Sequence, residues 1–371
     1  MKKKVLVAMS GGVDSSVAAA ILKEEGHEVL GATFRTWARN DCQNHDSRSC
    51  CSLAGVEDAR EVAHRLGIPH QIFNFEELFR KYVVDYFADE YLKGRTPNPC
   101  IACNEFIKFR LFFERARELG FDAIATGHYA QIGFDELRGA YYLAEGADPT
   151  KDQSYVLFPV GQELLPHILF PLGGLHKTRV REKAEKLGLP VKDKPDSQEI
   201  CFIPDNDYGS FIEKEYLGGK TGSIETKKQT GVIRTRDGKI LGLHEGYFHY
   251  TRGQRRGLRV PYAERLYVVD TDPQKNEVVV GPREDVLNHG CVVERVRWFL
   301  KPGKSRFQAY VKIRAQHRKA LANISLLEDD KARIVFEESQ EAITPGQGAV
   351  MYENARVLGG GWIESLLPAR A

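Results

Sequence analysis

The sequence predicts an α/β fold followed by two smaller β domains, on three observations. Short apolar runs alternate with segments of helical spacing in the first half of the chain. A glycine-rich loop joins the first apolar run to the first helical segment, and from about residue 208 glycines punctuate short β-type runs instead. Such alternation is typical of a doubly wound parallel sheet, whose ligand site lies beyond the carboxyl ends of the strands.

The N-terminal elements follow from apolar spacing and from residues that end helices. Val56, Ala59, Val62, Ala63 and Leu66 recur at helical spacing, and Gly67-Ile68-Pro69 ends that helix. By the same criteria, strands are expected at 5–8, 27–37, 70–75 and 122–125. Helices are expected at 15–22, 56–66, 76–92, 104–119 and 176–187, with a polar loop at 38–51.

The loop Ser10-Gly11-Gly12-Val13-Asp14 lies between the first strand and the first helix. Its glycines let backbone amides approach an anion, and the helix start adds unpaired N–H groups and a positive dipole end. A Walker loop needs a Lys-Ser or Lys-Thr pair after its second glycine, which is absent here, so γ-phosphoryl transfer is disfavoured. The loop is therefore a predicted phosphate cradle; the alternative is a serine-capped turn without a ligand.

The last third of the chain predicts two β domains. Thr235-Arg236-Asp237-Gly238-Lys239-Ile240 carries the Asp-Gly hairpin signal, and a second hairpin is expected over 266–280. Further strands are expected at 291–298, 307–314, 320–327 and 332–336, which favours a small barrel. We predict domains at 1–207 (catalytic), 208–285 (central, mainly β) and 286–371 (C-terminal β-barrel).

Composition limits the class of protein. The chain has 371 residues, 42% of them hydrophobic, and a formal net charge of only +2, so any nucleic-acid surface must come from local clustering. No leader peptide or membrane-spanning run is visible, which predicts a cytoplasmic protein without membrane association. Seven cysteines, an odd number, disfavour a secreted disulfide scaffold and favour reactive, metal-binding or buried thiols.

The cysteines differ in what their surroundings permit. Cys100 and Cys103 lie at the start of a helix, where a thiol becomes more acidic and more reactive. Cys201 follows the last helix of the α/β domain, where the chain can return over the same sheet edge. The alternative for the Cys-x-x-Cys pair is half of a zinc site or inert thiols. Roles for Cys42, Cys50 and Cys51 stay open, and Cys291 is expected in the core of a strand.

S-G-G-V-D-S resembles the signature of the PP-loop ATP pyrophosphatases, which split ATP between its α and β phosphates. The resemblance implies an adenine nucleotide alpha hydrolase-like fold, with Mg²⁺ placed near Asp14. It implies ATP binding by Ala8, Met9, Ser10, Gly11, Gly12, Val13, Asp14, Ser15, Phe34 and Gly127.

Seven motifs in order resemble the tRNA-specific 2-thiouridylase family across nearly the whole chain. They are S-G-G-V-D-S-S, C-C-S-L-x-x-V-E-D-A-R at 50–60, T-P-N-P-C-I-x-C-N at 96–104, A-T-G-H-Y at 125–129, K-D-Q-S-Y at 151–155, S-Q-E-I-C-F-I at 197–203 and T-P-G-Q-G-A-V at 344–350. The resemblance implies adenylation of the C2 oxygen of the wobble uridine. Sulfur then comes from a Cys201 persulfide, with Cys103 as the resolving nucleophile. A sulfur donor (a cysteine desulfurase or a sulfur-relay protein) and a thiol reductant follow as partners.

One position departs from the family pattern. The best-studied members have Asn-Pro-Asp where this chain has Asn98-Pro99-Cys100, which removes a carboxylate proposed for proton transfer. Three cysteines, Cys100, Cys103 and Cys201, are enough to hold a [4Fe-4S] cluster with one iron open, so a cluster mechanism is the alternative to the persulfide.

A basic run predicts where tRNA binds. The segment from Arg295 to Lys319 contains no acid and nine Lys or Arg residues, at 295, 297, 301, 304, 306, 312, 314, 318 and 319, with aromatic residues between them. The family correspondence implies tRNA contacts at Asn98, Pro99, Cys100, His128, Lys151, Asp152, Gln153, Arg314 and Gln347. Two rival readings are a PP-loop synthetase or amidotransferase on a small metabolite, and a non-catalytic RNA-binding sensor.

Overall fold

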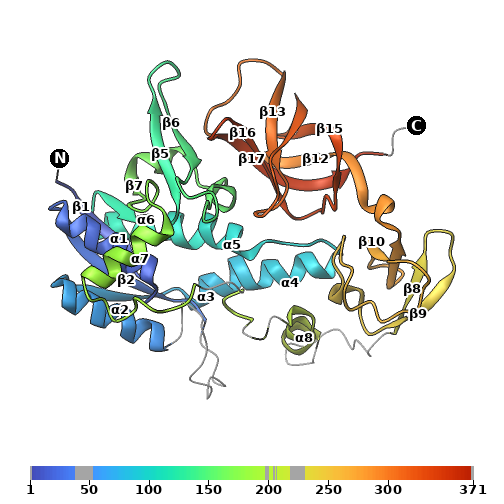
Figure 1. The fold of residues 1–371 in the computed structure, drawn as a ribbon, viewed down its shortest axis with the longest axis horizontal. Coiled ribbons are helices and arrows are strands. Elements are labelled where there is room, and N and C mark those ends of the chain that lie inside the picture. Colours follow the sequence, from blue (N-terminus) through green and yellow to red (C-terminus); the bar gives the residue numbers. More distant parts are fainter. Residues whose placement is uncertain are drawn as a thin grey trace.

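The computed structural model describes residues 2–37, 53–196, 200–203, 205, 207–217 and 230–368. The predicted polar loop with Cys42, Cys50 and Cys51, and the first three residues of the 197–203 motif, lie outside the described residues. Figure 1 shows the N-terminal domain in blue and green, the central sheet in yellow and orange, and the C-terminal barrel in orange and red. The predicted domain limits stay predictions.

The N-terminal domain is built on a parallel sheet of five strands in the order β3-β2-β1-β4-β7, which confirms the predicted fold class. The strands are β1 (Lys4–Ala8), β2 (Glu28–Arg35), β3 (His70–Asn74), β4 (Ala123–Ala125) and β7 (Ile168–Leu169). Val5, Leu6 and Val7 of β1 are fully buried, as expected for a strand covered on both faces.

Two apolar clusters cover the sheet. One packs α1 (Val13–Glu24), α2 (Leu53–Leu66) and α7 (Lys177–Lys186) against it. The other contains residues of β1, β4 and of a long helix that runs through α5 (Pro99–Ala102), η2 (Cys103–Leu111) and α6 (Phe112–Glu118). The η2 segment is π-helical, a distortion often found at functional sites.

A second long helix runs through α3 (Glu76–Phe79), η1 (Arg80–Val84) and α4 (Asp85–Leu92) and reaches the central sheet (Figure 1). There the Tyr247 hydroxyl donates to the Leu92 carbonyl at 2.6 Å. The central sheet has the order β10-β11-β8-β9 and confirms both predicted hairpins. Its strands are β8 (Gly231–Thr235), β9 (Ile240–His244), β10 (Tyr267–Asp272) and β11 (Glu277–Gly281).

The C-terminal domain is a closed six-stranded barrel, as predicted, in the order β12-β15-β14-β13-β16-β17 with β12 pairing back to β17. Its strands are β12 (Leu287–Trp298), β13 (Arg306–Lys312), β14 (Ala320–Leu326), β15 (Ala332–Glu341), β16 (Gly348–Glu353) and β17 (Arg356–Leu366). Cys291 is buried in the barrel core, as expected. Strands β16 and β17 were not among the strands expected from the sequence.

A hairpin that the sequence analysis missed joins the N-terminal domain to the barrel. It consists of β5 (Ala130–Asp135) and β6 (Ala140–Glu145), and Arg356 of β17 pairs with Ala144 of β6. Its turn lacks a two-residue Asn-Gly or Asp-Gly signal, and its outer partner is more than two hundred residues away in the chain.

The remaining short helices are η3 (Ser154–Leu157), η4 (Gln162–His167), α8 (Tyr208–Ile212), η5 (Glu213–Leu217), η6 (Tyr247–His249) and η7 (Arg283–Val286). Among the described residues, no helix combines the length and the apolar character needed to cross a bilayer.

Candidate functional site

The Ser10 to Ser15 loop turns from β1 into α1 and is held by its own side chains. The Ser10 amide donates to the Ser15 hydroxyl oxygen at 3.1 Å, and the Ser16 hydroxyl donates to the Gly12 carbonyl at 2.8 Å. The N-cap of α1 is Gly12, whose backbone is extended and which has no side chain to accept hydrogen bonds from the first amides of the helix. An anion fits such a terminus.

Two glycines are required for the close packing of this loop. Gly11 has a φ of +70°, and a methyl group there would overlap the Gly55 carbonyl oxygen and lie 2.9 Å from its carbonyl carbon. A methyl group on Gly127 would lie 2.7 Å from the Ser15 amide nitrogen and 2.8 Å from the Asp14 carbonyl carbon. The structure therefore brings Gly127, at the end of β4, against the start of α1, as the predicted ATP site requires.

Other residues predicted to bind ATP lie around the same edge of the sheet. The Thr33 hydroxyl donates to the Met9 carbonyl at 2.7 Å, which ties the end of β1 to β2. Phe34 packs edge-on against Phe112, with ring centroids 4.7 Å apart, and so lies between the sheet and the helix that carries Cys103. Ala8 is half-buried and Val13 is buried.

Asp14 is fully engaged by protein groups. Its carboxylate accepts hydrogen bonds from the Tyr129 hydroxyl at 2.7 Å and from the Lys177 ammonium at 2.7 and 2.8 Å. Burial raises the pKa of Tyr129, and the neighbouring Asp14 raises it further, so the phenol stays protonated as the donor. Mg²⁺ does not fit on Asp14 in this arrangement, because the ammonium already occupies the carboxylate. We derive no step through a metal at Asp14.

Lys177 and Asp196 are functional candidates that the sequence analysis missed. Lys177 begins α7, the helix end where a cation opposes the dipole, and it is only 8% exposed. Its ammonium also lies 2.7 Å from Asp196, which accepts from Lys151 at 2.8 Å. Burial alone raises the pKa of Asp196, but hydrogen bonds from Lys151 and Lys177 outweigh it and lower that pKa. The signal in the sequence is a lysine at a helix start, where an acid is normal.

The two catalytic cysteine candidates lie in one aromatic cluster. Cys103 begins η2 and is buried, whereas Cys201 is half-buried and packs against the same cluster. Phe202 is buried there, with its ring centroid 5.4 Å from that of Phe87 and 5.9 Å from that of Phe79. The structure therefore brings the chain around Cys201 back to the helix that carries Cys103, although almost a hundred residues separate them.

The three cysteines do not form a ready cluster site. Cys100 is exposed and Cys103 is buried. In the parts of the chain that the structure describes, no three His, Cys, Asp or Glu side chains are grouped to hold a metal ion. The residues do not fit a [4Fe-4S] cluster in this conformation, and we derive no step through one.

The loop before Cys100 is fixed to the barrel. Asn98 caps α5 by accepting from the Cys100 amide at 3.1 Å, and Pro99 fills the first helical position. The Thr96 amide donates to the Pro345 carbonyl at 2.9 Å, and the Gln347 side chain donates to the Thr96 carbonyl at 2.8 Å. The side chain of Gln347, a predicted tRNA contact, thus binds the cysteine loop.

The other predicted tRNA contacts differ in accessibility. His128 is buried between the Phe109 and Phe170 rings, where burial and Lys108 hold its pKa well below the usual value. The Asp152 carboxylate accepts from Lys312 at 3.0 Å, and the Gln153 side chain accepts from the Tyr129 amide at 2.9 Å.

Most of the basic run is exposed, and its role in tRNA binding stays a prediction. Arg295 and Arg297 pair with Glu105 but keep 53% and 43% of their side chains exposed, whereas Lys312 and Lys319 are half-buried beside Glu145. The remaining basic residues are also exposed: Lys301, Lys304, Arg306, Arg314 and Arg318. Of the aromatic residues between them, Tyr310 is 45% exposed, whereas Phe299 is buried.

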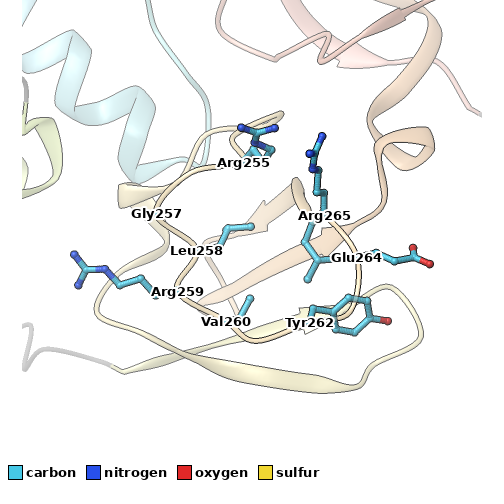
Figure 2. A pocket seen from close by; sticks show the side chains of 9 residues that line it. Arg255, Gly257, Leu258, Arg259, Val260, Tyr262, Glu264 and Arg265 are labelled. Atoms are coloured by element: carbon cyan, nitrogen blue, oxygen red, sulfur yellow. The ribbon is translucent and has the colours of Figure 1, made fainter.

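The central domain carries a basic hollow of about 320 Å³. Leu258, Val260 and Leu266 line it, together with Arg255 and Arg265, whose guanidinium groups lie on the same side (Figure 2). Arg259 points away from these two groups, and Tyr262 lies at the edge. The hollow therefore adds positive charge to the central domain.

Three family models match successive parts of the chain. They are described as tRNA methyl transferase HUP domain (residues 3–205), tRNA methyl transferase PRC-barrel domain (214–282) and Aminomethyltransferase beta-barrel domain (288–363).

Curated relatives match the chain over nearly its whole length. It is 50% identical to a protein of Caldicellulosiruptor saccharolyticus, over 99% of this chain and 100% of that protein. It is 46% identical to one of Geobacter metallireducens, over 99% and 98%, and 44% identical to one of Clostridioides difficile, over 99% of each. All three are named tRNA-specific 2-thiouridylase MnmA. A 4-thiouridine synthetase bound to RNA and ATP is 21% identical over 57% of this chain and 50% of that one, with a TM-score of 0.36.

Proposed function

This chain belongs to the tRNA-specific 2-thiouridylase family, and on that premise we propose that it thiolates C2 of the wobble uridine of tRNA at the expense of ATP. The observation that supports the proposal is how the cysteines and the loop relate to the parallel sheet. The cluster of Cys103 and Cys201 packs against Phe34 of β2, the strand that pairs with β1, and β1 leads into the loop at the start of α1.

ATP activates the uracil carbonyl in this proposal. A carbonyl oxygen is a poor leaving group, so the C2 oxygen attacks the α phosphate, pyrophosphate leaves, and the oxygen becomes part of AMP. The tight Gly11 turn and the amides at the start of α1 support binding of the phosphates. Lys177, buried beside Asp14, adds a positive charge close to the cradle. Methyl transfer, which the family models' names suggest, has no use for such a cradle.

Sulfur transfer uses two cysteines. The terminal sulfur of a Cys201 persulfide attacks C2, and AMP leaves. The Cys103 thiolate then attacks the Cys201 sulfur, the S–S bond breaks, and 2-thiouridine departs with the electron pair. The two thiols are oxidised to a Cys103–Cys201 disulfide, and a thiol reductant restores them. A cysteine desulfurase or a sulfur-relay protein reloads Cys201. A tRNA substrate is consistent with the predicted cytoplasmic location.

The test replaces the sulfur carrier. Cys201→Ser should abolish 2-thiouridine formation while tRNA binding persists, because the variant removes only the persulfide sulfur. Cys291→Ser, in the barrel core and away from the proposed site, is the matched control and should retain sulfur transfer. An active Cys201→Ser enzyme would refute the proposed chemistry.

Rival functions give different results in the same assays. The third thiol, Cys100, which is exposed near the helix start, is the reason to test the [4Fe-4S] alternative. Iron and acid-labile sulfide in protein purified without oxygen, with activity lost on chelation, would favour the cluster. A synthetase for a small metabolite would release pyrophosphate without tRNA, and an RNA-binding sensor would release none.

A further inference from the structure

We propose that Glu105 and Arg297 form a positioning pair through which the barrel holds the Cys103 helix in place for sulfur transfer. The proposal rests on the proposed function, because Cys103 is the resolving nucleophile there. It makes the barrel part of the catalytic machinery, in addition to any grip on RNA.

The pair joins two segments that are far apart in the chain. Glu105 lies two residues after Cys103 in η2, is 7% exposed, and accepts from Arg297 of β12 at 2.6 Å. Arg295 approaches the same carboxylate at 3.9 Å, and its guanidinium lies over the Trp362 ring at 3.8 Å. The barrel therefore presents two cations to one buried acid next to the cysteine.

The backbone of β12 is shaped for this contact. The pairing of β12 with β17 shifts register between Glu294 and Arg297, and Arg295 has a φ of +53°, which is unfavourable for a side chain other than glycine. Such a bulge redirects side chains out of a regular strand. Here both arginine side chains reach Glu105, so the unfavourable backbone conformation of Arg295 lies at the contact with the helix that carries Cys103.

A second attachment lies on the other side of the cysteines. Arg95 donates to Glu294 at 3.3 Å and to the Ile363 carbonyl at 3.5 Å, beside the two hydrogen bonds of Thr96 described above. The barrel thus contacts the chain at 95–96, before Cys100, and at 105, after Cys103. A segment fixed at both ends cannot shift or turn without breaking one set of contacts.

A gain in the stability of the interface does not by itself account for an ion pair between Glu105 and Arg297. Burial raises the pKa of Glu105, and Arg297 and Arg295 oppose that rise, so the ionised acid depends on its partners. A well-packed apolar contact stabilises an interface at least as well as a buried ion pair, whereas removal of Arg297 would leave the buried Glu105 carboxylate without its nearest cation. The pair therefore fixes position, while 43% of the Arg297 side chain stays exposed.

The test follows Cys103 directly. Iodoacetamide labelling of Cys103, followed by peptide mass spectrometry, reports how often the buried thiol becomes accessible. Arg297→Ala should raise the labelling rate at least about tenfold, the effect of about 1.4 kcal/mol on a local opening. The same variant should lower kcat at least tenfold while the KM for tRNA stays unchanged. Glu105→Gln should act in the same direction, and Arg297→Lys should restore part of both effects.

The matched control is another ion pair between the barrel and the N-terminal domain. Arg356 of β17 donates to Asp135 of β5 at 2.9 Å, away from the cysteine helix. Arg356→Ala should leave Cys103 labelling and kcat at wild-type values. Equal labelling rates in wild type, Arg297→Ala and Glu105→Gln would overturn the proposal.

A second outcome would also overturn the proposal. If Arg297→Ala raised the KM for tRNA, retained kcat and reduced the slope of log K for tRNA binding against log salt by about one, Arg297 would be an RNA contact instead. Absence of thiolation by the wild-type enzyme would refute the proposed function instead, and the labelling comparison would still decide whether the pair holds the helix.

Discussion

Replacing Gly11 by alanine tests the geometry of the phosphate cradle. Gly11 has a φ of +70°, where an alanine costs about 1–2 kcal/mol. The added methyl group would also lie 2.9 Å from the carbonyl carbon of Gly55, so α2 or the loop must move, which adds about 1–3 kcal/mol. We expect Gly11→Ala to lower the free energy of unfolding by about 2–5 kcal/mol and to abolish ATP binding.

Gly12→Ala is the control for this change. Gly12 has a φ of −102°, and the nearest atom to a methyl group there is the Ser10 hydroxyl oxygen at an ordinary 3.5 Å. Its free energy of unfolding should fall by only about 1 kcal/mol or less, the usual cost of alanine at an N-cap. Urea unfolding of the three proteins, with ATP binding followed by calorimetry, makes the comparison. Equal stability of Gly11→Ala and Gly12→Ala would refute the reasoning about the turn.

Three further predictions concern charge. Lys177→Met should lower the free energy of unfolding by about 2–3 kcal/mol at pH 7, because Asp14 and Asp196 lose a shared cation. The control is Lys183→Met in the same helix, which removes a single, more exposed ion pair and should change the free energy of unfolding by less than about 0.5 kcal/mol. Equal effects of the two substitutions in urea unfolding would contradict this prediction. Burial lowers the pKa of His128, so below pH ~6.5 its imidazole takes up a proton in the unfolded chain but not in the folded one. The free energy of unfolding is therefore unaffected by His128 above pH ~6.5 and falls by about 1.4 kcal/mol per pH unit below it. His128→Gln should remove that part of the acid sensitivity, and a parallel pH profile for the two proteins would count against it. Arg314→Ala should weaken tRNA binding and reduce the slope of log K against log salt by about one, and an unchanged slope would exclude a phosphate contact at this exposed residue.

Local patterns predicted the parts of the fold that depend on neighbouring residues. The alternation of strands and helices predicted the parallel sheet, and Asp237-Gly238 predicted the β8–β9 hairpin, because each signal lies within the element that it specifies. The β5–β6 hairpin escaped because its outer strand is stabilised by β17, whose position only the folded chain determines.

The candidate site shows the same limit. The Ser10 to Ser15 loop was visible as a motif, since a turn between a strand and a helix is local. The role of Lys177 was not, because its partner Asp14 lies 163 positions earlier in the chain. Likewise the basic run gave no sign that Arg295 and Arg297 pair with Glu105, an acid from another domain.

The most direct test of the proposed chemistry follows one oxygen atom. An anticodon stem-loop carrying ¹⁸O at C2 of the wobble uridine is incubated with the enzyme, ATP and the sulfur donor for a single turnover, and the AMP is weighed by mass spectrometry. Activation of C2 by adenylation predicts AMP that carries the ¹⁸O, in an amount equal to the 2-thiouridine formed. Unlabelled AMP alongside newly formed 2-thiouridine would contradict it.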